Sequence, residues 1–416
     1  MNRRLFTRHR TLVANFGYLS ALEVARLVFP LFTYPYLIRV LKPETYGSII
    51  FAQGIIGYYS VLINFGFQTT ATQEIAQLRD DKEKLSLAVS TTMQAQLSLW
   101  AVCALFHVLL VCAVPALAQN KALYLLTFGS TISDVLFPSW YFQGIERMRY
   151  ITFISCTSRL LTVLSVFALV HQQSDYLILP IISMAASVVS SISAVSIMVR
   201  HGVKLRPQPV QRVREAMAGS APLFYSNGFA SVADQGGTLV VGAALGAAEL
   251  AYYNLAEKII RLASALYFNM ARTLYPNLAR SRNKEMSRKA TRIVLMSGLA
   301  GTFAIGVGAQ WIIPLVGGER MAPAIGVLRS LAPYIVFAAI GPLLVNVLMF
   351  EGKRGTIFTN TMIASVVYVG SLVLLSLGHN LTIYTVAVAF LASIVVRVAH
   401  RFWVVKHNGL TDWLYA

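Results

Sequence analysis

The chain has 416 residues, of which 56% are hydrophobic and only 12% are charged, and its formal net charge is +18. Because soluble globular domains carry about 25% charged residues, this composition excludes a protein that folds mainly in water. Apolar runs recur from one end of the chain to the other, and the first, at about 11–41, is too long to be a signal peptide. The sequence therefore predicts an all-α, polytopic membrane protein.

Twelve segments are apolar and long enough to cross a bilayer, which takes about 20 helical residues. In chain order they lie at about 11–41, 48–76, 85–113, 121–142, 150–171, 176–199, 217–244, 249–279, 293–316, 322–350, 356–378 and 382–404. Several contain proline, which predicts kinks that neighbouring helices can accommodate.

The loops between these segments divide the cations unequally. Loops on one side hold 24 Lys and Arg residues, whereas the opposite loops hold only Lys42, Lys121 and Arg320. The positive-inside rule then predicts that both termini are cytoplasmic. These cations are scattered over short loops without interleaved aromatic residues, so we expect them to face anionic membrane lipids and expect no nucleic-acid partner.

The chain divides into two halves that echo each other. We expect six-helix lobes at 1–200 and 217–416, joined by a cytoplasmic linker at 201–216. The triplets Phe142-Gln143-Gly144 and Phe350-Glu351-Gly352 lie 208 residues apart and are each followed by basic residues. They are expected to be matching cytoplasmic turns. Parallel repeats of this kind are typical of alternating-access transporters, although a duplicated channel or structural protein stays open.

Charged residues also occur inside the apolar segments. Arg39, Arg329 and Arg397 lie near segment ends and can reach the headgroups. The deeper charges are the cations Arg26, Arg159, Lys258, Arg261 and Arg272 and the acids Glu23, Asp134, Asp234 and Glu257. Each charge at the centre of a bilayer costs about 2.5–3.5 kcal/mol, so these side chains must face one another or a water-filled cavity.

One helical face gathers the excess of positive charge. Asn254, Lys258, Arg261, Asn269 and Arg272 recur at helical spacing and form a polar stripe. Together with Arg26 and Arg159, the cations of this stripe are the candidate substrate-binding residues for an anion such as phosphate. The alternative, left open here, is that Glu23 simply pairs with Arg26 and Glu257 with Arg261.

Five stretches carry a family resemblance. They are "FPLFTYPYLIRVLKPETYG" (29–47), "NFGFQTTATQEIAQLRDDKEK" (64–84), "PSWYFQGIERM" (138–148), "YNLAEKI" (253–259) and "LYPNLAR" (274–280). The chain resembles the Wzx-type O-antigen flippases, in the polysaccharide-transporter branch of the multidrug/oligosaccharidyl-lipid/polysaccharide exporter superfamily. Where that family usually has Leu-Gly-Pro-Glu, this chain has Lys42 in place of the glycine, which questions the geometry of that turn.

The resemblance implies a MATE-like arrangement of two six-helix lobes around a cationic cavity. It implies a flippase of the bacterial inner membrane that moves an undecaprenyl-pyrophosphate-linked O-antigen repeat unit to the periplasmic leaflet by alternating access. Polymerase and chain-length proteins of the same pathway would be its partners. No cofactor is expected; coupling to a proton or sodium gradient would use Glu23, Asp134, Asp234 or Glu257.

Two other classes of function are alternatives to a flippase. A polytopic glycosyltransferase, polymerase or ligase would need long extracytoplasmic loops, a nucleophile with its base, or a metal site, and the sequence offers none of these motifs. We therefore expect a transporter rather than an enzyme. A small-molecule exporter of the same fold is the nearer alternative, but a carrier of cationic drugs would favour an acidic rather than a basic lumen.

Overall fold

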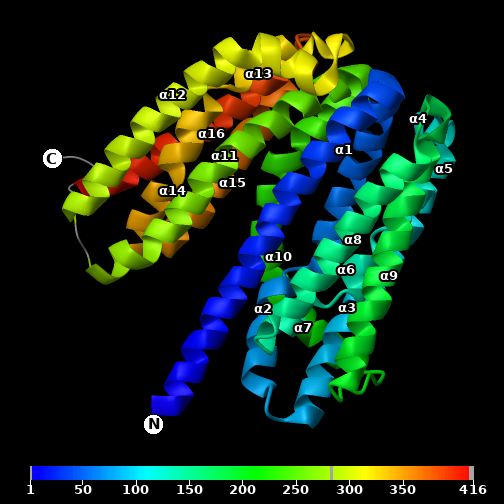
Figure 1. Ribbon diagram of the computed structural model, residues 1–416, viewed down its shortest axis with the longest axis vertical. Coiled ribbons are helices and arrows are strands. Elements are labelled where there is room, and N and C mark those ends of the chain that lie inside the picture. Colours follow the sequence, from blue (N-terminus) through cyan, green and yellow to red (C-terminus); the bar gives the residue numbers. More distant parts are fainter. Residues whose placement is uncertain (1, 282–283, 412–416) are drawn as a thin grey trace. The chain divides into compact units, whose positions relative to one another are not determined.

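The computed structural model describes the backbone of residues 2–281 and 284–411 (Figure 1). Side chains are described over the same ranges except at 2–13, 16, 27, 31, 233, 234, 269–281, 284, 286, 287, 350 and 354. Every regular element in the described ranges is helical, and they contain no strand. The expected all-α class is therefore confirmed.

The first part of the chain forms nine α-helices and one short 3₁₀ helix among the described residues. They are α1 (Asn2–Asn64), α2 (Phe67–Leu78), α3 (Lys82–Ala113), α4 (Pro115–Ala118), α5 (Lys121–Gly129), α6 (Ile132–Leu136), α7 (Ser139–Gly144), α8 (Met148–Leu169), η1 (Gln173–Leu177) and α9 (Ile178–Arg200).

The remainder continues in the same way over its described residues. Its elements are α10 (Val210–Ala244), α11 (Ala247–Ser281), α12 (Lys284–Gly317), η2 (Glu319–Met321), α13 (Ala324–Leu331), α14 (Tyr334–Phe350), α15 (Arg354–Leu377) and α16 (Ile383–His407).

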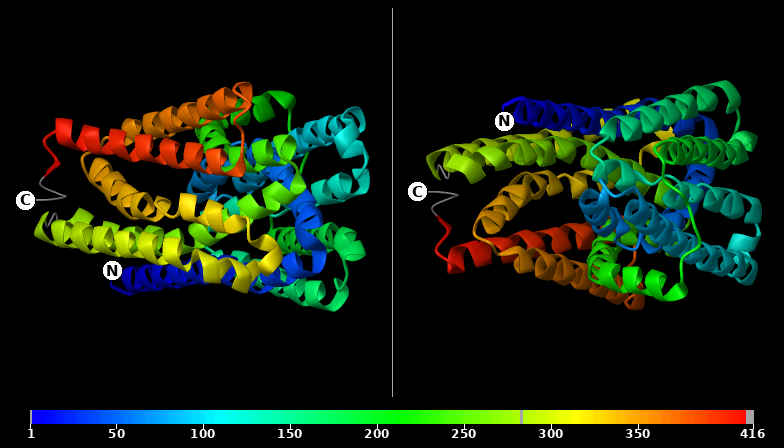
Figure 2. Two further views of the ribbon diagram at one scale, coloured as in Figure 1. Left: turned by 90° about the horizontal axis from the view of Figure 1, so that it is seen from above. Right: turned by 90° about the horizontal axis from the view of Figure 1, so that it is seen from below.

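The helices form two compact units. The first unit contains Met1–Leu41 and Ala52–Gly228, and the second contains Lys42–Phe51 and Phe229–Ala416. Ten residues from the middle of α1 therefore belong to the second unit, although most of α1 belongs to the first. In the second unit α14 packs against α11, α12 and α16, and α15 lies against α16 (Figure 2).

The twelve apolar segments of the sequence all fall on helices. Eight helical stretches of the described chain are long and apolar enough to cross a membrane, and they account for nine of the twelve expected spans. The other three expected spans correspond to α10, to α11 and to the broken series α5–α7. Helix α11 falls outside the apolar group because it carries the polar stripe, whereas α5–α7 are interrupted.

The interruption of the fourth expected span has a local cause. The hydroxyls of Ser130, Thr131 and Ser133 each donate to the carbonyl three residues earlier, which competes with regular helical bonding. Pro138 then lacks the N–H that the carbonyl of Asp134 would need to continue the helix. The side chain of Gln96 donates to that carbonyl instead, at 3.2 Å. The break therefore fixes Asp134 beside α3.

The turn at Lys42 separates the first two expected spans within α1. Lys42 has φ 62° and ψ 160°, a conformation that suits glycine and strains a residue with a Cβ. Pro43 follows and restricts its neighbour to extended ψ values. The turn therefore keeps a backbone shape suited to glycine although lysine occupies the position.

The two Phe-x-Gly triplets do lie near matching turns, but in a different register from the one their letters suggest. In the first turn Glu146 is left-handed (φ 58°) and the N–H of Arg147 donates to the carbonyl of Phe142. In the second, Gly352 is left-handed (φ 70°) and Lys353 donates to Leu348. Both are Schellman motifs that end a helix.

The structurally equivalent residues of these turns are Glu146 and Gly352, so Gly144 is not the counterpart of Gly352. Gly144 is the last residue of α7, where an added Cβ would lie 2.5 Å from Cγ2 of Ile75 on α2. One glycine therefore permits close helix packing, whereas the other permits a left-handed turn.

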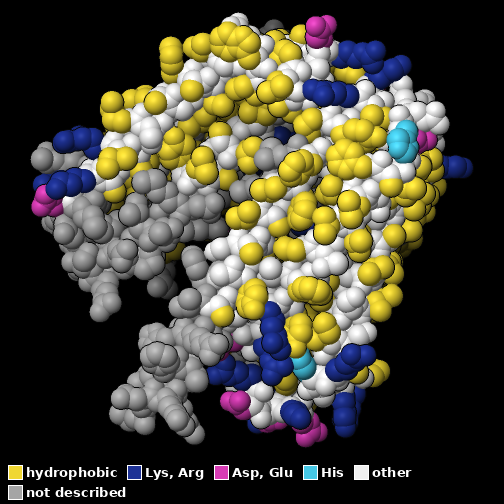
Figure 3. Space-filling model, in the orientation of Figure 1, with side chains coloured by type: hydrophobic (Ala, Val, Ile, Leu, Met, Phe, Trp, Pro, Cys, Tyr) yellow, Lys and Arg dark blue, Asp and Glu magenta, His cyan; other side chains and the backbone are white. Residues whose placement is uncertain are grey.

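Apolar side chains cover the outward surfaces of several helices. On α8 the exposed residues Phe153, Leu160, Leu164 and Phe167 recur at helical spacing. Figure 3 shows hydrophobic side chains over the visible face of α8 and α9, with Lys and Arg gathered at the helix ends. This distribution is the one expected of helices whose sides contact lipid and whose ends reach the headgroups.

Residues 42–51 are tightly inserted into the second unit. A Cβ on Gly47 would lie 1.7 Å from the carbonyl oxygen of Ala247, so the two backbones touch. Four residues later, Phe51 packs on Gly242, where a Cβ would lie 2.3 Å from its ring. The segment thus depends on the absence of side chains at Gly47 and Gly242.

Candidate functional site

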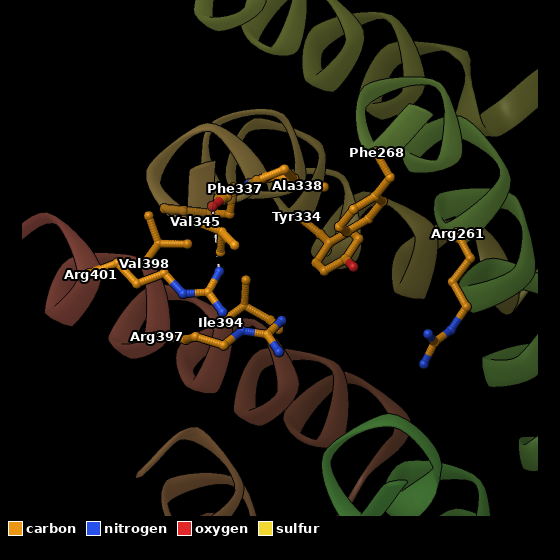
Figure 4. Close-up of a pocket in the computed structure, with 12 residues that line it drawn as sticks. Arg261, Phe268, Tyr334, Phe337, Ala338, Val345, Ile394, Arg397, Val398 and Arg401 are labelled. Carbon is orange, nitrogen blue, oxygen red and sulfur yellow. Dashed lines mark hydrogen bonds between the residues drawn. The ribbon is translucent and has the colours of Figure 1, made fainter. Parts of the chain in front are cut away.

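A pocket of about 410 Å³ lies in the second unit between α11, α14 and α16. Its polar lining includes three arginines, Arg261 from α11 and Arg397 and Arg401 from α16 (Figure 4). Aromatic side chains complete the wall, namely Phe268, Tyr334 and Phe337. No carboxylate lines this pocket among the described residues, so it is suited to an anion.

Arg397 and Arg401 are one helical turn apart, so both project from the same face of α16 toward α14. The Nη1 of Arg401 donates to the carbonyl of Gly341 at 3.5 Å, and its Nε is buried without a hydrogen-bond partner in the described structure. A buried guanidinium nitrogen without a partner is costly. An anion in the pocket could supply the missing acceptor.

Sequence reasoning missed both of these residues. Arg397 was expected to reach the headgroups, and Arg401, near the end of the expected span 382–404, was counted among the 24 loop cations. In the structure α16 continues to His407 and carries both into the pocket wall. Their i, i+4 spacing on an apolar helix was the one feature of the sequence that indicated a shared site. Which helix they would face could not be read from the sequence.

Arg261 lines the pocket but also makes an ion pair. Its Nε and Nη2 donate to Oε1 of Glu257 at 3.0 and 2.7 Å. Glu257 is nearly buried, with 9% of its side chain exposed against 40% for Arg261. The pairing that the i, i+4 spacing suggested is therefore present, and Glu257 orients Arg261 while offsetting part of its charge.

Lys258 lies outside the group of residues that line the pocket. Its Nζ donates to the phenolic oxygen of Tyr46 at 2.9 Å and lies 5.4 Å from the centre of that ring. Asn254, one turn earlier in the stripe, is buried and its Oδ1 has no hydrogen-bond partner among the described residues. The polar stripe on α11 is therefore divided between two sites. Lys258 contacts residues 42–51, and Arg261 lines the pocket.

The remaining members of the second-unit set cannot be placed in the same way. The side chains of Asn269 and Arg272, at the far end of the stripe, lie outside the described residues, as does that of Asp234 on α10. Their proposed roles remain predictions.

In the first unit, α1 and α8 bring together three of the predicted charges. Glu23 and Arg26 form an ion pair at 3.6 Å, with about half of each side chain exposed. Arg159 is half-buried and lies within electrostatic range of both. The group carries two cations and one acid, so pairing does not cancel its positive charge.

Asp134 sits in a separate polar network of the first unit. Ser60 donates to its Oδ2 at 2.6 Å and Asn64 to its Oδ1 at 3.3 Å. Gln96, which binds the carbonyl of Asp134, accepts in turn from the indole of Trp140 at 3.3 Å. No Lys or Arg pairs with the carboxylate of Asp134 in the described structure, so its partners are neutral donors only.

Comparisons with known proteins agree with this architecture. Residues 12–282 match a family described as "Polysaccharide biosynthesis protein". A protein of Escherichia coli (strain K12), named "Putative O-antigen transporter", is 25% identical over 336 residues, covering 79% of this chain and 80% of the relative. A protein of the same name from Shigella dysenteriae is 26% identical over 154 residues, covering 36% of this chain and 38% of the relative.

Solved structures share the fold. The chain matches a structure described as lipid II flippase MurJ in an inward closed conformation, with a TM-score of 0.78 and 13% identity, over 94% of this chain and 87% of the other. It also matches an inward-facing multidrug resistance MATE family transporter of the MOP superfamily, with a TM-score of 0.70 and 14% identity, over 95% and 99%. At such low identity these matches show the fold alone.

Proposed function

We propose a function from one premise, that the chain belongs to the polysaccharide biosynthesis protein family and has the helical fold of MOP-superfamily transporters. It is a membrane transporter that moves a lipid-linked polysaccharide repeat unit from one leaflet to the other. The carrier lipid is undecaprenyl pyrophosphate, the membrane is the bacterial inner membrane, and the direction is toward the periplasm. Polymerase and chain-length proteins would act on its product.

The arginine pocket of the second unit is the observation that supports this function. A pyrophosphate presents several oxygens that accept hydrogen bonds, and the planar fork of a guanidinium matches phosphate geometry with two bonds at once. Arg397 and Arg401 bring two guanidinium groups to one pocket from α16, and Arg261 adds a third from α11 whose Nε and Nη2 are held by Glu257. The aromatic wall suits the faces of sugars or the first apolar part of the lipid.

The same pocket argues against two other functions. An exporter of cationic drugs would require negative charge, whereas the described lining is cationic. An enzyme of glycan assembly would require a group that attacks or activates the sugar linkage. Arginines bind and neutralise phosphate without that chemistry, so we assign the chain to transport rather than to catalysis.

Energy for directed transport would come from an ion gradient acting on Asp134. A carboxyl held by Ser60 and Asn64 can gain or lose a proton, or bind sodium, without breaking an ion pair. Glu257 is less suited to this task because Arg261 already holds it. We therefore propose Asp134 as the residue that couples transport to the ion gradient.

Charge-neutralising substitutions on α16 test the proposed function. Arg397→Gln and Arg401→Gln together should abolish O-antigen display in a host that lacks its own flippase, while lipid-linked repeat units accumulate in the membrane. Lys406→Gln is the matched control, because Lys406 is an exposed cation on the same helix that does not line the pocket. Normal display by the double variant, at normal protein level, would rule out a role for the pocket.

A further inference from the structure

The segment after α9 is held along α3 by a regular set of hydrogen bonds. The backbone N–H groups of Lys204, Arg206 and Gln208 donate to the side chains of Ser86, Ser90 and Gln94. These three bonds are 3.1, 3.1 and 2.8 Å long. We call residues 203–208 the strap.

The spacing of these bonds follows from helix and strand geometry. Four residues of an α-helix advance about 6 Å, and two residues of extended chain advance about 6.6 Å. Acceptors at every fourth residue of α3 therefore meet donors at every second residue of the strap. A second bond, from Nε2 of Gln94 to the carbonyl of Gln208 at 3.1 Å, fixes the far end.

The strap creates a basic pocket at the start of α3. Because side chains repeat every two residues in extended chain, Lys204 and Arg206 lie on one side of the strap. With Lys82 they line a pocket of about 300 Å³, at the lower end of the volumes typical of small-molecule sites. Glu83 is the one acid of the lining, and it forms no ion pair with these cations in the described structure.

The positive charge of this pocket is not neutralised by nearby carboxylates in the described part of the chain. None of the three cations forms an ion pair with a carboxylate among the described residues. The N-terminal N–H groups of α3 are not available for a ligand either, since Asp81 accepts from Glu83 and Lys84 at 3.1 Å each. Recognition here would depend on the three side-chain cations.

The pocket lies at the level where lipid headgroups are expected. Its two walls are the beginning of one candidate span, Lys82–Ala113, and the chain that follows the end of another, Gln173–Arg200. Between the two strap cations, Leu205 is 45% exposed. Cations flanking an exposed apolar side chain are typical of surfaces that rest on a bilayer.

We propose that the pocket of Lys82, Lys204 and Arg206 binds a phosphate ester, with the headgroup of an anionic phospholipid as its source. This site is separate from the arginine pocket proposed for the transported substrate, because it lies in the first unit and shares no lining residue with it. A bound headgroup would join the strap to α3 through its phosphate.

Lipid titrations of the purified full-length protein test this proposal. Short-chain phosphatidylglycerol should bind more tightly than phosphatidylcholine of the same chain length, measured by native mass spectrometry. In Lys204→Gln/Arg206→Gln the affinity for phosphatidylglycerol should fall about tenfold or more. Lys353→Gln/Lys406→Gln removes the same charge from exposed positions outside the pocket and should change it less than twofold.

Further arms of the experiment separate the sources of the phosphate and the role of the strap. Inorganic phosphate binding as tightly as phosphatidylglycerol would make a soluble phosphate ester the ligand, whereas phosphatidylglycerol binding alone identifies the lipid. Ser90→Ala/Gln94→Leu keeps all three cations but loosens the strap, and should also weaken binding. The proposal would be overturned if Lys204→Gln/Arg206→Gln and Lys353→Gln/Lys406→Gln lost the same affinity for phosphatidylglycerol, or if neither lost any.

Discussion

The ammonium group of Lys258 donates a hydrogen bond to the phenol of Tyr46, although 212 residues separate the two in sequence. Tyr46 is 2% exposed, so the bond is formed inside the second unit. It ties residues 42–51 to α11 and occupies a cation that the sequence assigned to the substrate.

Tyr46→Phe should destabilise the protein by about 1–3 kcal/mol, because it removes a hydrogen bond to a charged group while keeping the ring. Thermal unfolding in detergent measures the effect. In a Lys258→Met background the same substitution should cost much less, since the donor is already gone. An equal cost in both backgrounds would show that the bond contributes nothing.

Lys42→Gly should stabilise the protein by about 1 kcal/mol. The positive φ of Lys42 strains a residue with a Cβ, whereas glycine adopts it freely but loses more entropy on folding. Lys42→Ala is the control, because it removes the same charge and keeps the strain. If the alanine variant unfolds at the same temperature as the glycine variant, strain at this turn is not the cause.

Asp134→Asn should uncouple transport from the ion gradient while leaving the fold intact, because asparagine retains a similar shape and one acceptor oxygen. Transport of lipid-linked oligosaccharide into proteoliposomes should then proceed at the same rate with and without an imposed proton or sodium gradient. Glu319→Gln removes an exposed acid and should leave the response unchanged. A normal gradient response in Asp134→Asn would exclude this residue from coupling.

The stability of the first unit should fall as the pH is lowered through the titration of His201. Burial and the charges of Arg147 and Arg149 lower the pKa of His201, and Arg147 donates to its Nε2 at 2.9 Å, a bond that only the neutral ring can accept. The pKa of a histidine in an unfolded chain is about 6.5. Stability is therefore complete above that pH and decreases below it until the folded pKa is passed.

His201→Gln should flatten this dependence, because glutamine can accept from Arg147 at any pH. Midpoints of thermal unfolding between pH 8 and pH 5 measure it, with His379→Gln as the control at an exposed loop histidine. A slope that stays the same in His201→Gln would assign the pH dependence to other groups.

The sequence predicted where the helices lie better than it predicted which residues they contact. Apolar length placed all twelve expected spans on helices, nine of them in stretches long and apolar enough to cross a membrane. The i, i+4 spacing of Glu257 and Arg261 indicated that they could pair. Aligning the two Phe-x-Gly triplets paired Gly144 with Gly352, whereas the structural counterpart of Gly352 is Glu146. The reason is that a left-handed turn is a backbone conformation, which Glu146 adopts although it is not glycine. Letter matches could not show that Gly144 is needed for packing on Ile75.

The candidate pocket was predictable only in part. Arg261 was identified from its stripe, but Arg397 and Arg401 were assigned to the headgroups and a loop by their distance from the end of a segment. Their position depends on how α16 packs against α14, which is set by contacts between residues far apart in sequence. The bond from Lys258 to Tyr46 could not be predicted for the same reason, since Tyr46 comes from a segment 212 positions earlier, and the role of Lys258 in binding substrate stays a prediction.

Because residues 42–51 pack into the second unit, they must wait during synthesis until their contact residues in that unit have been made. Gly47 leaves the ribosome 200 residues before Ala247, the residue its backbone touches. At about 5–20 residues per second, this interval is about 10–40 s. Throughout it, Tyr46 and Phe51 lack their partners on α10 and α11. The early helix must therefore remain in the membrane with an incomplete interface for this time.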